Sequence, residues 1–273
     1  MTAWRISLTA LAALLVLAPG AMAQTSGLIR LTDRDDLFGW EAVGRVDLGR
    51  DGYCTGVLIA PDQVLTAAHC VYDPAQRGIN PDIIRFRAGL RDGVVIAESG
   101  VARYVVAPGY DPAAGMQAEN VRRDVALMHL STPIPAALAS PFHLAATPAP
   151  GQRVSVVSYG RDRDKAPSWQ RDCGLLWRSE GVMGFDCAVI NGSSGAPVFA
   201  RDGGRARILS LVSGGNWDGG ESRAYGMDLP DLVARLKQDL RAAASRPLAA
   251  NPGFRRVTVG GDAATSGAKF ARP

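Results

Sequence analysis

The sequence has few of the side chains that most often bind metals, because its 273 residues include only three histidines and four cysteines. No His, Cys and Glu residues stand at a spacing typical of zinc sites, so we expect no metal and no other cofactor. An excess of charge is also lacking, since the formal net charge of +4 comes from the two ends of the chain. Between residues 24 and 247 there are 25 basic and 25 acidic residues, interspersed along the sequence. This pattern argues against a nucleic-acid partner.

Long apolar runs are missing too, except at the N-terminus. There Arg5 precedes the apolar run Ile6 to Leu17, which Pro19-Gly20 interrupts before it reaches the roughly 20 residues of a membrane span. The small residues of Ala21-Met22-Ala23 then match a signal-peptidase site. Residues 1–23 are therefore predicted to be a signal peptide. The mature protein is predicted to be secreted or periplasmic, without a membrane partner.

The four cysteines are best interpreted as two disulfides, because a secreted chain folds in an oxidising compartment. The positions are Cys54, Cys70, Cys173 and Cys187. Four cysteines allow three pairings, and their number alone does not choose among them.

Short runs rich in apolar and β-branched residues, bounded by turn residues, dominate residues 40–230. The predicted strands are Ala42–Leu48, Thr55–Ala60, Gln63–Thr66, Ile83–Ala88, Val94–Ala97, Val101–Ala107, Val125–Leu130, Arg153–Tyr159, Gly174–Arg178, Ala196–Ala200 and Arg207–Ser213. Because no helices alternate with them, the pattern favours an all-β sandwich or a pair of barrels.

One helix is predicted at the end of this region, over Pro230–Ala244. Its apolar residues Leu232, Val233, Leu236 and Leu240 share one face and should pack against the strands. Beyond it the sequence has few large apolar residues, so residues 247–273 are predicted to be a flexible basic tail.

Three segments carry side chains that could act together in catalysis. His69 follows a predicted strand among small residues, whereas His129 and His143 lie in apolar surroundings without a nearby nucleophile and are interpreted as structural. Asn191 to Pro197 is a turn of small residues in which backbone N–H groups could stabilise an oxyanion beside a serine, although such a sequence is also typical of a flexible loop. Asp124 precedes an apolar strand and could orient an imidazole or simply pair with a neighbouring arginine.

Taken together, these segments resemble the trypsin/chymotrypsin superfamily of serine proteases. Thr66 to Cys70 matches the TAAHC segment of that family, Asp124 to Met128 resembles D-I-A-L-L, and Gly192 to Pro197 resembles GDSGGP, in the same order along the chain. The pattern is closest to the secreted bacterial glutamyl-endopeptidase-like branch, which shares Asp186-Cys187 before the serine motif. The resemblance implies an all-β, chymotrypsin-like fold of two antiparallel six-stranded Greek-key barrels with a C-terminal helix.

The resemblance also implies a role for each matching residue. Ser194 would be the nucleophile, His69 the general base and then acid, and Asp124 the group that holds the imidazole. Ser193 competes for the first role, but the position within the motif favours Ser194. The N–H groups of Gly192 and Ser194 would form the oxyanion hole.

Further expectations follow from the same family. Ser213, Gly214 and Gly215 would bind the substrate backbone, and the pairings Cys54–Cys70 and Cys173–Cys187 would apply. Residues 38–246 would form the protease domain, with the active site between its two barrels. A short N-terminal segment, residues 24–37, would precede this domain.

Departures from the family pattern limit the specificity that can be inferred. Ser193 stands where animal trypsins have an Asp that pairs with the new N-terminal amine, and no activation motif follows the predicted signal peptide. The base of the S1 pocket falls at Ala188 or Val189, so cleavage after Arg or Lys is not expected. Leu211 and Val212 stand where Glu-specific members carry a His, which leaves the P1 residue open.

The predicted function is a secreted serine endopeptidase that acts on protein or peptide substrates through an acyl-enzyme and works as a monomer. Two alternatives are an inactive protease-like binding protein and an esterase. The complete set of catalytic residues argues against the first, and the absence of a G-x-S-x-G elbow between a strand and a helix argues against the second.

Overall fold

The computed structural model describes residues 27–50, 52–146, 151–200, 204–218 and 221–245. The predicted signal peptide, residues 1–23, and the predicted tail, residues 247–273, lie outside these ranges and stay predictions. None of the described helices has the length and apolar character needed to cross a bilayer.

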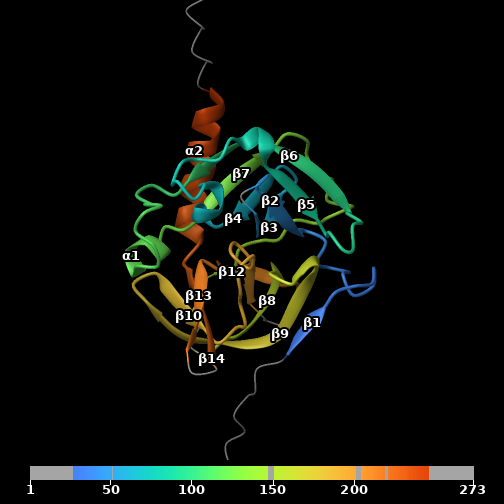
Figure 1. The fold of residues 1–273 in the computed structure, drawn as a ribbon, viewed down its shortest axis with the longest axis vertical. Coiled ribbons are helices and arrows are strands. Elements are labelled where there is room, and N and C mark those ends of the chain that lie inside the picture. The colour runs from blue at the N-terminus through green and yellow to red at the C-terminus, as the bar shows by residue number, and fades with distance from the viewer. Residues whose placement is uncertain (1–26, 51, 147–150, 201–203, 219–220, 246–273) are drawn as a thin grey trace, which may run out of the picture.

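The first half of the chain forms a closed, antiparallel barrel of six strands (Figure 1). The strands are β2 (Val43–Asp47), β3 (Tyr53–Ala60), β4 (Gln63–Thr66), β5 (Arg85–Ala88), β6 (Ala97–Val106) and β7 (Ala126–Leu130). They pair in the order β2-β3-β4-β7-β6-β5. Three short helical segments lie between them: η1 (Ala68–Val71), η2 (Pro81–Ile83) and α1 (Ala118–Val121).

The second half forms an eight-stranded curled sheet. Its strands are β8 (Arg153–Gly160), β9 (Arg163–Ser179), β10 (Val182–Phe185), β11 (Pro197–Ala200), β12 (Arg207–Leu211), β13 (Gly214–Asp218) and β14 (Glu221–Met227), with β1 (Leu28–Arg30) paired to β9. The main path runs β12-β11-β8-β9-β10-β14-β13, and no pairing between described residues closes it. The chymotrypsin-like, all-β fold is thus confirmed, with a curled sheet of more strands as its second half.

The long strand β9 explains why this half differs in detail from the expected six strands. It pairs with β8 along its first part, with β10 along its last part, and with β1 on its outer side. Only Gly174–Arg178 was predicted as a strand, because the polar start of β9 and Pro167 hide the alternation expected of a strand. Pairing with β1 also places part of the expected N-terminal segment, residues 24–37, against the second sheet.

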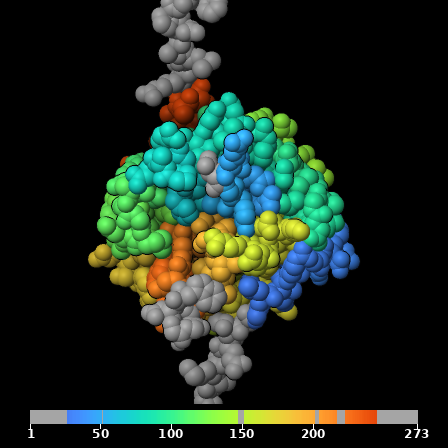
Figure 2. All heavy atoms as spheres, in the orientation of Figure 1, coloured from blue at the N-terminus to red at the C-terminus, as the bar shows by residue number. Residues whose placement is uncertain are grey.

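Aromatic side chains join the two halves. Phe142 packs against Phe199 with ring centroids 4.6 Å apart, and Trp40 packs against Phe199 and Trp169 at 5.0 and 5.1 Å. On the surface the blue and green first half meets the yellow and orange second half across the middle of the molecule (Figure 2). Loops from both halves can therefore contribute to one site at this boundary.

The predicted C-terminal helix is present as α2 (Pro230–Ser245), which packs against β6 and β7 of the first barrel. Val233, Leu236 and Leu240 are buried, and Leu232 is partly buried. After the second sheet, α2 thus returns to the first barrel and holds the halves together.

Candidate active site

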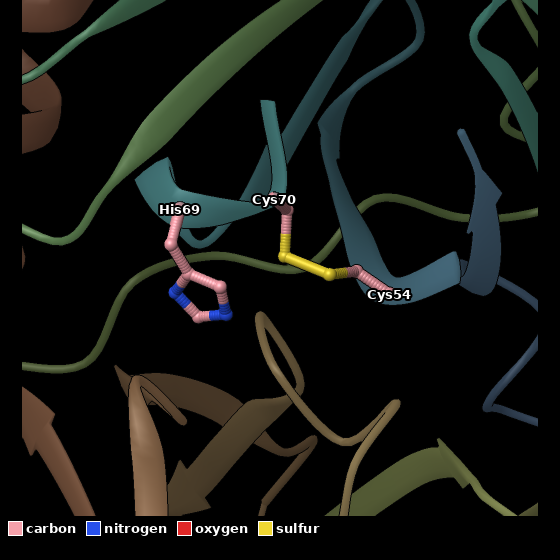
Figure 3. A group of neighbouring side chains, drawn as sticks. All are labelled: Cys54, His69 and Cys70. Carbon is pink, nitrogen blue, oxygen red and sulfur yellow. A yellow bond between two sulfur atoms is a disulfide. The ribbon is translucent and has the colours of Figure 1, made fainter. Parts of the chain in front are cut away.

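His69 lies in η1, directly after β4 of the first barrel. Its neighbours Ala68 and Cys70 are buried, whereas the His69 side chain is 37% exposed. A disulfide joins Cys70 to Cys54 on β3, with a Cα–Cα distance of 6.2 Å. The imidazole ring extends away from this disulfide toward the second half of the molecule (Figure 3). Small buried neighbours and the covalent link therefore fix the backbone and leave the ring free to face the boundary.

Asp124 lies between α1 and β7, and its carboxylate is surrounded by three hydrogen-bond donors. Oδ2 accepts from His69 Nδ1 at 2.8 Å and from the Ser213 hydroxyl at 2.5 Å, and Oδ1 accepts from the His69 backbone N–H at 2.9 Å. The residue is only 3% exposed. These contacts exclude the surface ion pair considered from the sequence, and they leave His69 Nε2 as the ring nitrogen that can accept a proton.

The buried carboxylate also changes the titration of the imidazole. Burial by itself lowers the pKa of His69, but the Asp124 charge and its hydrogen bond raise it, and the net pKa lies above the usual 6.5. The arrangement thus stabilises an imidazolium, the form that results when His69 takes a proton.

Ser194 lies on the loop between β10 and β11 of the second sheet, and its backbone is fixed from both sides. Its carbonyl accepts from the Thr55 N–H of the first barrel at 2.9 Å, and the next N–H, that of Gly195, donates to Val212 O at 2.7 Å. Ser193 is fully buried, whereas Ser194 is partly exposed. Of the two serines, Ser194 is the one that solvent and a substrate can reach.

Gly192 and Gly195 flank this position with φ angles of +93° and +76°, which L side chains rarely adopt. A Cβ on Gly195 would lie 2.2 Å from Thr66 Oγ1 and 2.3 Å from Thr55 O, so only glycine fits between the loop and the first barrel. Among the described residues, no acceptor takes a hydrogen bond from the N–H of Gly192 or of Ser194. Two neighbouring donors are thus left for a ligand.

The structure does not join all of the predicted residues by hydrogen bonds. Between described atoms it shows none from the Ser194 hydroxyl to the His69 ring, a bond that often forms only when substrate is bound. Gly214 and Gly215 begin β13, an edge strand whose outer side is open to pairing in the described sheet. Val189 Cγ2 would lie 2.5 Å from a Cβ on Gly215, so an apolar side chain packs closely on this strand.

A pocket of about 250 Å³ adjoins the histidine. Besides His69, Asp124 and Ser213 it is lined by Tyr110, Pro112, Gly115, Met116, Asn120 and Val121. Most of this lining comes from the segment before β7, and it could receive an apolar side chain. This pocket was not predicted, because nothing in the sequence signals that residues 110–121 fold over His69.

Outside the His69–Asp124 pair, the structure shows a second His–Asp contact and two disulfides, one of which flanks His69. His129 on β7 contacts Asp62 at 3.4 Å. The pairings Cys54–Cys70 and Cys173–Cys187 are confirmed. Within the described ranges, potential metal ligands gather around His69, with Cys54 and Cys70, and around Asp186, with Cys173 and Cys187. In both groups the two cysteines form a disulfide, so their sulfurs are not thiolates that could bind a metal.

Two contributors to the site were not predicted from the sequence. Thr55 donates its hydroxyl to Gly192 O at 2.9 Å and its N–H to Ser194 O, so that one β3 residue fixes the nucleophile loop. Ser213 was expected only as a substrate-binding residue, and the structure adds a direct bond to Asp124. Both depend on contacts between residues more than 80 positions apart, which no local pattern reveals.

Comparison with known proteins decides the family. A family model described as Trypsin matches residues 37–235. The chain belongs to the trypsin family. Among curated relatives, cercarial protease of Schistosoma mansoni is 31% identical over 166 residues, covering 55% of this chain and 58% of that protein. Glutamyl endopeptidase of Bacillus licheniformis is 26% identical over 165 residues, covering 59% of this chain and 50% of that protein.

The chain thus spans between half and three-fifths of the length of these relatives. A solved structure of a Glu endopeptidase in complex with MPD superposes with a TM-score of 0.63 at 18% identity. The match covers 81% of this chain and 98% of that one, which supports the same fold. The resemblance to trypsin-like serine proteases, with affinity to the glutamyl-endopeptidase-like group, is confirmed.

Proposed function

We propose that this trypsin-family protein is a secreted serine endopeptidase that hydrolyses peptide bonds through an acyl-enzyme, with His69, Asp124 and Ser194 as its catalytic residues. The observation that carries the proposal is the buried Asp124 carboxylate, which holds the His69 ring through Nδ1 at 2.8 Å. A His–Asp ion pair on the surface forms without such burial. It also forms without the two further hydrogen bonds that Asp124 accepts, from the His69 backbone N–H and from the Ser213 hydroxyl. These contacts fix one tautomer and one ring orientation.

The mechanism follows from the position of each group. Ser194 Oγ attacks the substrate carbonyl carbon and transfers its proton to His69 Nε2, and Asp124 stabilises the imidazolium that forms. The developing oxyanion accepts hydrogen bonds from the N–H groups of Gly192 and Ser194. His69 then gives the proton to the leaving amine, and the C–N bond breaks. Water attacks the ester, with His69 again as base, to release the carboxylic acid and restore Ser194.

Substrate binding is assigned to the open edge of β13. A peptide in extended conformation would pair with Ser213, Gly214 and Gly215, so that the scissile bond lies over Ser194. The side chain preceding the P1 residue would enter the apolar pocket beside His69. The residues expected at the base of the S1 pocket, Ala188 and Val189, carry no charge, so no charged P1 residue is assigned. Two disulfides are consistent with an extracellular location.

The test replaces Ser194 in two ways. Ser194→Ala should abolish peptide hydrolysis, lowering kcat by about 10⁴-fold or more, and should prevent labelling by a fluorophosphonate probe. Ser194→Cys serves as the matched variant, since it keeps a nucleophile of similar size and should still react with a thiol-directed peptide inhibitor. Digestion of a peptide library by the wild-type protein then distinguishes a protease from an esterase. Wild-type protein that neither cleaves peptides nor reacts with the probe would show an inactive, protease-like binding protein instead.

A further inference from the structure

A partly buried guanidinium lies directly behind the nucleophile loop and takes no part in the mechanism above. Arg163, the first residue of β9, reaches the loop at Ser193, and Nη2 donates to Ser193 Oγ at 3.1 Å. Nη1 donates to Ser158 O at 2.9 Å, and both Nη1 and Nη2 lie 3.2 Å from Ser158 Oγ. Ser158 and Ser193 are fully buried, or nearly so.

The charge of this group has no counter-ion in the described part of the chain. No carboxylate oxygen there lies within 4.0 Å of Arg163, and its Nε is buried without a hydrogen-bond partner. Burial lowers the pKa of Arg163 below its usual value, although the nearby Tyr53 counteracts part of the effect. Placing a cation among neutral oxygens costs free energy. The contacts that the guanidinium makes must therefore offset the free-energy cost of burying its charge.

The Ser193 side chain that Arg163 contacts is part of a turn in the nucleophile loop. Its hydroxyl also accepts from the Ile190 N–H at 3.3 Å, and its own N–H donates to Ile190 O at 2.9 Å, which closes a turn. Gly192 lies inside this turn, and its carbonyl is held by Thr55. The turn is thus fixed at both ends, while the N–H groups of Gly192 and Ser194 have no acceptor among the described residues.

We propose that Arg163 is a positioning residue that holds the oxyanion loop in its active conformation through the Ser193 hydroxyl. This inference rests on the proposed function, because it assigns a task to the same site. An uncharged Ser193 suffices at this position because the cation is supplied from within the folded domain, by Arg163 at the start of β9. A second cation, such as a chain terminus, would be repelled there.

The main test is a double-mutant cycle in the full chain. Arg163→Met keeps an unbranched apolar stem in place of the arginine stem but removes the guanidinium with its charge and donors, and should lower kcat about 100-fold, with KM changed less than threefold. Ser193→Ala should lower kcat about tenfold. If Arg163 acts through Ser193, the double variant should be no slower than Arg163→Met alone, since the contact is already lost. Multiplicative effects of the two substitutions would overturn the proposal, as would an Arg163→Met kcat within threefold of wild type.

A control and a second measurement keep structural damage separate. Arg178→Met removes another arginine of β9, one that pairs with Asp228 on the surface, and should leave kcat unchanged. Hydrogen exchange of the Ile190 and Ser193 amides should become faster in Arg163→Met while exchange in the first barrel stays the same. This readout requires no activity, so it would still decide the positioning role if the wild-type protein proved inactive and the proposed function failed. Unchanged exchange at both amides would refute the role. Should Arg163→Met not fold, Arg163→Lys, which keeps the charge but lacks the fork of donors, replaces it in both measurements.

The chain terminus provides an independent outcome. An uncleavable extension before Gln24 should leave kcat within threefold of the form that begins at Gln24, because Arg163 and not a free amine holds the loop. A loss of about a hundredfold that trimming restores would show that the terminus is required, and would overturn the proposal.

Discussion

Replacing Asp124 by Asn tests the site most directly, because the two side chains have the same shape but different hydrogen-bonding capacity. The Asp124 carboxylate accepts three hydrogen bonds: from His69 Nδ1, from the His69 backbone N–H and from the Ser213 hydroxyl. An amide offers one oxygen and one NH₂ group, so that one of its two ends becomes a donor. Each of its two orientations has a defined consequence.

With the amide oxygen in the place of Oδ2, the NH₂ group faces the backbone N–H of His69, and two donors collide. With the NH₂ group in the place of Oδ2, the oxygen still accepts from the His69 N–H. The Ser213 hydroxyl then rotates to accept a hydrogen bond instead of donating one. His69 Nδ1 must then also act as the acceptor. The second orientation satisfies every group, but it places the imidazole proton on Nε2, where His69 can no longer take the proton of Ser194.

The expected loss in kcat/KM is therefore about 10⁴-fold, equal to roughly 5.5 kcal/mol of transition-state stabilisation. Because the hydrogen bonds survive, the free energy of unfolding should fall by no more than about 2 kcal/mol. Peptide hydrolysis measures the first quantity and urea unfolding the second. Nitrogen-15 NMR of the histidine ring should show the proton moved from Nδ1 to Nε2.

The chain offers a matched control in its other His–Asp contact. Asp62 lies 3.4 Å from His129 Nδ1 on the first barrel, away from the loops of the site, so Asp62→Asn should leave kcat/KM unchanged. An Asp124→Asn protein that keeps more than a tenth of wild-type kcat/KM would refute the assignment of Asp124. A large loss accompanied by unfolding would instead show that Asp124 mainly supports the fold.

Three further predictions follow from the site and its supports. Because the pKa of His69 is raised and only the neutral imidazole acts as base, kcat/KM should rise with pH and reach half its maximum above pH 6.5; a flat profile between about pH 6 and 8 would exclude His69 as the base. Gly195→Ala should lower the free energy of unfolding by about 3 kcal/mol in urea titrations and abolish activity, whereas Gly115→Ala, at φ +61° with open space, should cost about 1 kcal/mol. Replacing Cys173 and Cys187 by Ser should cost about 3 kcal/mol of stability, yet a non-reduced peptide map should still show the other disulfide.

Much of the fold was predictable because the determining signals are local. Alternating apolar residues revealed the strands of the first barrel, and the stripe of Val233, Leu236 and Leu240 revealed α2. Strands without such alternation were missed, above all the polar start of β9 and the glycine-rich β13. β13 pairs with β14, which follows it directly, and the start of β9 pairs with β8 just before it and with the distant β1. Backbone hydrogen bonds hold these residues in the sheet, so polar residues and glycines fit there without the apolar alternation that reveals a strand.

For the site, the sequence by itself determined which residue types are available: one histidine beside small residues, one acid before an apolar strand, and a serine among glycines. Only the tertiary structure decided how they work together. Folding buried Asp124 and surrounded it with three donors, two of them from His69, and it brought Thr55 of the first barrel against the loop of the second sheet. It also placed Arg163 behind Ser193, a contact across 30 positions that no motif contains. The physical reason is that a hydrogen bond depends on the positions of its two atoms in space, and the chain sets those positions only by packing both halves at once.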